Sequence, residues 1–143
     1  MPSVELQAVL PEDFESMLVI RIEALRESLE RLGRFDPDTQ RARLKILFRP
    51  EWMQHLLVDG ERIGYFTVEP RAGELRLHHL YLRPDAQGQG VGAWVINQIK
   101  ARGLPITLGA LRESRANAFY RSHGFQVVAE QEFDIEYRWE PGA

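Results

Sequence analysis

With 143 residues and 44% hydrophobic content, the chain is long enough to bury a core and fits a single domain, residues 1–143. A net charge of −3 gives no basic excess that would indicate nucleic-acid binding, and the lack of cysteine excludes disulfides, thiolate metal sites and a cysteine nucleophile. No signal-peptide pattern opens the sequence and no apolar run approaches the roughly 18 residues of a membrane span, so we expect a cytoplasmic protein without membrane contact.

The first part of the chain predicts one strand and one long helix. Loose alternation over Val4 to Leu10 indicates the strand. Pro11 suits the first position of a helix, and the acidic residues after it favour the positive end of the helix dipole. Apolar residues then recur every three or four positions, with either Ile22 or Arg21 on the apolar face, until Gly33 ends the helix.

A second helix and a hairpin follow. Asp36 is a suitable N-cap for a helix from Pro37 to about Phe48. Two strand-like segments, Trp52 to Val58 and Ile63 to Glu69, flank Asp59-Gly60. An Asp-Gly pair between such segments predicts a tight hairpin turn, although the loop can extend two residues further.

The second half predicts alternating strands and helices that end in a hairpin. A strand over residues 75–82 leads through a glycine-rich turn into a helix whose apolar face carries Val91, Val95 and Ile99. The remaining expected elements are a strand over 105–111, a short helix capped by Ser114 that ends near Gly124, and strands over 125–130 and 133–140. Three consecutive strands indicate antiparallel pairing and the strand–helix–strand crossover a parallel pair, so we expect an α+β protein with a mixed sheet.

The turn before the long apolar helix of the second half has the chemistry of an anion site. It consists of Gln87, Gly88, Gln89, Gly90, Val91 and Gly92. Amides at the start of a helix lack partners inside the helix, and glycines let a phosphate approach the bare backbone. The alternative is a tight strand-to-helix turn without a ligand. The turn is no Walker A loop, because no Lys-Ser/Thr follows, and its glycine spacing does not match the dinucleotide-binding pattern.

Two blocks resemble the GNAT superfamily of N-acetyltransferases. Gln87-x-x-Gly90-x-Gly92 is similar to the family's (Gln/Arg)-x-x-Gly-x-(Gly/Ala) motif, and it follows a strand that ends in Leu-Tyr-Leu-Arg-Pro. Asn117, Tyr120 and Gly124-Phe125 resemble the family's next block. The resemblance covers about residues 60–128. It implies a mixed, mostly antiparallel central sheet of about six to seven strands with helices on both faces.

The resemblance also implies a cofactor site. The pyrophosphate of acetyl-coenzyme A would lie on the amides from Gln87 to Gly92. Its pantetheine arm would pair like an added strand with Leu80, Tyr81 and Leu82, where one amide near Tyr81 or Leu82 would polarise the thioester carbonyl. Asn117 would bond to the pantetheine or to a nearby backbone group, or it is an ordinary polar residue in the first turn of a helix.

Tyr120 is the expected general acid. Transfer expels a thiolate whose parent thiol has a pKa of about 8.5, and a nearby phenol with a pKa of about 10 can protonate it. The alternative is that Tyr120 is a packed aromatic residue beside Phe119, and the flanking motif favours the catalytic role.

The general base is left open between several groups. His78 and His79 are adjacent on a strand, so their side chains should point to opposite faces. The resemblance to the family implies that His78 is slightly the more favoured base, and a bulge near Leu82 would reverse this order. Glu69 and a chain of water molecules are further candidates, and each histidine can instead have a structural role. The histidines have no carboxylate at metal-ligand spacing, so we expect no metal site.

Together these features predict an acetyltransferase that moves an acetyl group directly from acetyl-coenzyme A to a primary amine of a small molecule or protein. A non-catalytic acyl-coenzyme A sensor on the same fold is the alternative, because a sensor needs the phosphate turn but neither Tyr120 nor a base. The sequence predicts no nucleic-acid or membrane partner. A homodimer through the last strand is compatible with it.

Overall fold

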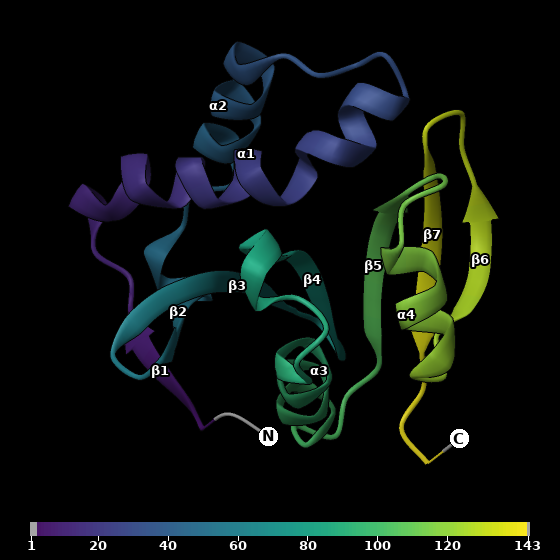
Figure 1. The fold of residues 1–143 in the computed structure, drawn as a ribbon. Coiled ribbons are helices and arrows are strands. Elements are labelled where there is room, and N and C mark those ends of the chain that lie inside the picture. The colour runs from purple at the N-terminus through teal and green to yellow at the C-terminus, as the bar shows by residue number, and fades with distance from the viewer. Residues whose placement is uncertain (1–2, 143) are drawn as a thin grey trace. The chain divides into compact units, whose positions relative to one another are not determined.

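The computed structural model describes residues 3–142, and its elements follow the predicted order (Figure 1). Short 3-10 turns precede α1, β2 and the glycine-rich turn. The helices and strands are β1 (Val4–Ala8), α1 (Phe14–Arg31), α2 (Pro37–Ile46), β2 (Met53–Val58), β3 (Glu61–Arg71), β4 (Glu74–Leu82), α3 (Val91–Lys100), β5 (Ile106–Leu111), α4 (Ala116–Ser122), β6 (Gln126–Glu130) and β7 (Asp134–Trp139).

The strands form a mixed sheet in the order β1-β2-β3-β4-β5-β7-β6. β4 and β5 are parallel, whereas the β1–β2, β2–β3, β5–β7 and β6–β7 pairs are antiparallel. A sheet of seven mostly antiparallel strands with four α-helices confirms the predicted fold class. Among residues 3–142, no helix combines the length and apolar character needed to cross a membrane.

Residue contacts divide the chain into two compact units. The first unit comprises Met1–Thr67 and His79–Gly92, and the second comprises Val68–His78 and Ala93–Ala143. The first therefore contains the helices α1 and α2 and the glycine-rich turn, and the second contains α4 and the strands β5 to β7.

The core of the first unit lies where α1 and α2 meet the strands. Its buried residues are Val9, Met17, Leu18, Ile20, Leu44, Met53 and Tyr65. Arg21 lies among them with only 6% of its surface exposed, whereas Ile22 is half-buried. The Arg21 Nε donates to Gln40 on α2 at 2.9 Å, and its guanidinium lies 5.2 Å from the centre of the Tyr81 ring. Of the two alternatives for the apolar face of α1, Arg21 is therefore the buried one.

Local signals in the first unit are also where they were predicted. The Asp38 N–H donates to the Asp36 carboxylate at 3.1 Å, which caps α2. Asp59 and Gly60 have φ values of 53° and 77° between the paired residues Val58 and Glu61. Two positive φ angles in a two-residue loop define a type I′ turn. The hairpin therefore uses the short turn and not the longer alternative.

The second unit packs α4 against β5, which lies beside β7 and then β6 (Figure 1). Ile96, Ile99, Ile106, Leu108 and Tyr137 are almost fully buried. One prediction here was wrong, because Ser114 does not cap α4. The N-cap is Arg115, whose backbone is helical and whose side chain makes no capping bond.

Candidate functional site

The glycine-rich turn of the first unit is shaped by its own backbone and glutamine side chains. Gly88 and Gly90 have φ values of 76° and 86°, a region that residues with a Cβ rarely adopt. The Gln87 Nε2 donates to the Leu82 carbonyl at 3.1 Å, and the Gln89 Nε2 donates to the Asp85 carbonyl at 3.2 Å. These bonds hold the turn against the end of β4.

The backbone of this turn remains available to a ligand. Within residues 3–142, no backbone oxygen accepts a hydrogen bond from the N–H groups of Gly88, Gln89 or Gly90. A Cβ built on Gly88 would meet no atom within 4 Å, so the space beside this backbone is open. Amide donors in an open, glycine-lined turn fit an anion such as a diphosphate.

The adjoining segment of β4, Leu80 to Leu82, is the predicted pairing edge for the pantetheine arm. The parallel ladder with β5 joins Leu75, Arg76 and Leu77 of β4, and it stops before this segment. On the side of β3, a Cβ on Gly64 would lie only 2.3 Å from the Tyr81 carbonyl oxygen. β3 therefore approaches β4 closely here only because residue 64 has no side chain.

His79 belongs to a buried aromatic cluster in the first unit. It is 3% exposed, and its Nδ1 lies 2.8 Å from the Thr67 hydroxyl. Its ring stacks with that of Tyr81 at 5.6 Å and meets Tyr65 edge-on at 5.9 Å. Burial raises the pKa of Tyr65, and the nearby Tyr81 adds to this effect, so Tyr65 is a neutral phenol at any physiological pH.

His78 lies in the second unit and has different partners from those of His79. Its Nε2 is 2.8 Å from the Glu69 Oε1, and Arg71 also bonds to this carboxylate. The hydrogen bond to His78, followed by that to Arg71, holds the pKa of Glu69 below its ordinary value. His78 and Glu69, two of the candidate bases, therefore form one hydrogen-bonded pair. Arg76, on the same strand, pairs with Glu136 of β7.

Asn117 and Tyr120 both lie on α4 in the second unit. Asn117 Nδ2 donates to the Leu111 carbonyl at 2.7 Å, and its Oδ1 accepts from the Tyr137 hydroxyl at 2.8 Å. One of the alternatives for Asn117, a bond to a nearby backbone group, is therefore formed. Tyr120 is 8% exposed and has ring contacts with Phe119, Phe125 and Tyr137.

The sequence did not indicate how some polar groups of the first unit are paired. Thr67, the partner of His79, reads as an ordinary strand residue, and no local signal marks it. Glu23 and Arg83 form a wide ion pair at a pocket on α1, and only the fold brings them together. Within residues 3–142, no group of three or more His, Asp or Glu side chains is arranged to hold a metal ion.

Comparison with known proteins identifies the family. The model of the acetyltransferase (GNAT) domain family matches residues 52–127, which is more than half of the chain. No curated protein matches the sequence.

Solved structures match over nearly the whole chain at low identity. PaiA N-acetyltransferase from Thermoplasma acidophilum, in complex with coenzyme A, is 18% identical with a TM-score of 0.77, covering 96% of this chain and 99% of that one. An acetyltransferase from Thermus thermophilus is 22% identical with a TM-score of 0.73, covering 97% and 99%. A GNAT acetyltransferase from Listeria monocytogenes is 16% identical with a TM-score of 0.64, covering 96% and 94%. At such identities these likenesses show the fold.

The family match and the fold agree with the two sequence blocks around the glycine-rich turn and α4. They confirm the predictions of an acyltransferase and of acetyl-coenzyme A as its co-substrate. The chain belongs to the GNAT family of acetyltransferases.

Proposed function

We propose that this chain transfers an acetyl group directly from acetyl-coenzyme A to a primary amine of a small molecule or protein. The observation that carries the proposal is the continuity of two features in the first unit. The edge of β4 from Leu80 to Leu82 lies beyond the β5 ladder, and it leads into a turn whose amides from Gly88 to Gly90 have no backbone acceptor within residues 3–142. An extended amide-containing arm that ends in a diphosphate fits these two features in this order.

The turn and the strand would divide the work of binding. The amides of Gly88 to Gly90 would bind the diphosphate, with the first amides of α3 adding the positive end of the helix dipole. The backbone of Leu80 and Leu82 would pair with the pantetheine amides as a strand does. An amide near Tyr81 would donate to the thioester oxygen as negative charge develops there, which lowers the barrier to attack.

Three proton transfers complete the reaction. An alkylammonium acceptor, with a pKa near 10, must lose a proton before its nitrogen can attack the thioester carbon. His78, held by the ionised Glu69 at 2.8 Å, is the base that we favour, because the hydrogen-bonded carboxylate fixes the orientation of the imidazole ring. When the carbon–sulfur bond breaks, the Tyr120 hydroxyl would give its proton to the thiolate, and the resulting phenolate would take up the second proton that the acetylated nitrogen must lose to become an amide.

A screen of amine classes tests this proposal. Purified protein is incubated with acetyl-coenzyme A and a polyamine, an amino acid, an aminoglycoside or a peptide with a free amino terminus, and release of free thiol is followed. We expect thiol release with one class above the rate without an acceptor, and a large loss in the His78→Gln variant. Silence with every class, despite binding of acetyl-coenzyme A, would contradict transfer to an amine.

A further inference from the structure

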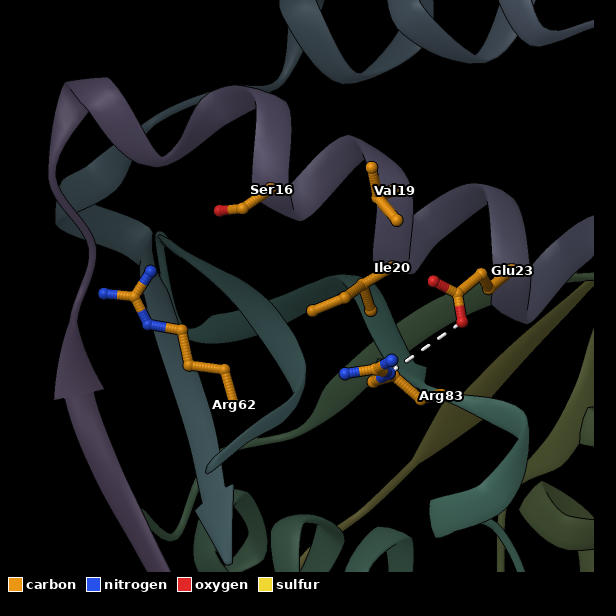
Figure 2. Close-up of a pocket in the computed structure, with 6 residues that line it drawn as sticks. All are labelled: Ser16, Val19, Ile20, Glu23, Arg62 and Arg83. Atoms are coloured by element: carbon orange, nitrogen blue, oxygen red, sulfur yellow. Dashed lines mark ion pairs between the residues drawn. The ribbon is translucent and has the colours of Figure 1, made fainter. Parts of the chain in front are cut away.

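A pocket in the first unit lies apart from the glycine-rich turn. It has a volume of about 290 Å³ and is bounded by α1, the start of β3 and the residue that follows β4. Figure 2 shows Glu23 on α1 facing Arg83 across this space. Its lining residues are Ser16, Val19, Ile20, Glu23, Arg62 and Arg83.

Glu23 and Arg83 form an incomplete ion pair. The Arg83 Nε lies 3.8 Å from the Glu23 Oε2, and its Nη1 lies 3.5 Å from Glu61. Both separations exceed the 2.7–3.2 Å or so of a good N–H···O bond. The Arg83 Nε is buried and donates no hydrogen bond within residues 3–142. The two side chains are 36% and 37% exposed, so their attraction is weakened by solvent.

The other lining residues give the pocket an apolar wall and a second cation. Val19 has 55% of its surface exposed, and Ile20 lies next to it on α1. The Ser16 hydroxyl already donates to the Asp13 carbonyl at 2.9 Å. Arg62 bonds to Gln7 through Nε and to Asp13 through Nη1, so its charge is shared with neighbours outside the pocket.

We propose that this pocket binds a small zwitterion, an amino acid with an apolar side chain. Its carboxylate would bond to Arg83, whose planar fork suits a carboxylate, and its ammonium group would bond to Glu23. Its side chain would cover Val19, and so remove the exposed apolar surface of this residue from water. One wide ion pair inside the protein would thereby be replaced by two short ones.

The charges of the lining favour a zwitterion over simpler ligands. A purely anionic ligand at Arg83 would meet the carboxylate of Glu23, and a purely cationic ligand at Glu23 would meet two guanidinium groups. The volume is at the lower end of the roughly 300–1,000 Å³ of small-molecule sites, which fits a ligand of amino-acid size. This inference does not depend on acetyl transfer, because it concerns other residues and can be measured without acetyl-coenzyme A.

Leucine and two analogues, each lacking one of its charged groups, test the proposal by titration calorimetry. Leucine carries both charged groups, 4-methylpentanoate lacks the amine, and 3-methylbutylamine lacks the carboxylate. We expect leucine to bind at millimolar concentration or below, about tenfold or more tighter than either analogue. No binding of leucine by the wild-type protein, or equal binding of all three ligands, would overturn the proposal.

Variants assign each charge to its partner. Arg83→Gln should weaken binding of leucine and 4-methylpentanoate but not of the amine, and Glu23→Gln should weaken leucine and the amine but not the carboxylate. Arg102→Gln and Glu132→Gln, at exposed positions outside the pocket, are matched controls that should change nothing. Because Glu23 lies outside the glycine-rich turn, Glu23→Gln should keep the thermal shift caused by acetyl-coenzyme A, which also shows that it folds. Equal losses in pocket and control variants would refute the site.

Discussion

Replacing Asn117 by alanine separates its structural role from a role at the cofactor. The change removes the acceptor of the Tyr137 hydroxyl, which lies at 2.8 Å on a fully buried side chain, and the donor of the Leu111 carbonyl, at 2.7 Å. Leaving the buried Tyr137 hydroxyl without its acceptor costs about 1–3 kcal/mol, whereas the Leu111 carbonyl keeps a second donor, the Ser114 N–H at 3.2 Å, so the total cost should be about 1–3 kcal/mol. For a domain of this size, that is a fall in Tm of about 3–12 °C.

The assay pairs thermal unfolding with cofactor binding. Tyr137→Phe removes only the hydroxyl and should cost about 1 kcal/mol, the typical net contribution of one hydrogen bond. The loss of stability in the double variant should be about 1 kcal/mol smaller than the sum of the losses in the two single variants, because the two residues share one hydrogen bond. Acetyl-coenzyme A should bind to folded Asn117→Ala protein with a Kd within about threefold of wild type. An unchanged Tm together with a large loss of cofactor affinity would refute the structural role.

Three further changes test other parts of the structure. Gly64→Ala places a Cβ 2.3 Å from the Tyr81 carbonyl oxygen, so the free energy of unfolding in urea should fall by about 1–3 kcal/mol; no fall would refute the close approach. The hydrogen bond to His55, then that to Leu10, lowers the pKa of Asp13 below 3.8, so its contribution to stability is fully present above 3.8 and is lost as the pH falls from there through the lowered pKa. The difference in Tm between wild type and Asp13→Asn should therefore stay constant down to about pH 4 and shrink below it, and a difference that stays constant down to about pH 2 would contradict this linkage. Tyr120→Phe should slow turnover while acetyl-coenzyme A affinity stays within about threefold, and unchanged turnover would remove Tyr120 from the proton transfer.

Local signals were enough to predict most of the fold. Proline fixes its own φ, and aspartate and glycine readily adopt the cap and turn conformations that other residues avoid, so the start of α2 at Pro37 and the turn at Asp59-Gly60 followed from neighbouring residues alone. The cap at Ser114 failed for the opposite reason. The Ser114 carbonyl and hydroxyl both lie within hydrogen-bonding distance of the Asn117 amide group, so the residue closes the turn before α4 instead of capping the helix.

The parts of the candidate site that lie within one continuous segment could be predicted from the sequence. The contacts between residues from different segments could not. The glycine-rich turn is continuous, and its positive φ angles follow from Gly88 and Gly90. The partners of the two histidines, Thr67 for His79 and Glu69 for His78, come from β3. The alternation of side chains along β4 predicts that the histidines face opposite sides of the sheet, but it does not predict which residues of β3 lie beside them. The same holds for Glu23 and Arg83, which are 60 positions apart in the sequence and face each other only in the folded chain.

Binding of acetyl-coenzyme A by the glycine-rich turn is tested most directly by comparing it with acetyl-pantetheine, which carries the same thioester arm but no diphosphate. In calorimetric titrations, wild-type protein should bind acetyl-coenzyme A at least tenfold or so more tightly than acetyl-pantetheine. Gly90→Ala, which forces a Cβ onto a backbone with φ of 86°, should remove most of that advantage. Equal affinity of the wild-type protein for the two ligands would contradict the assignment of the turn as the diphosphate site.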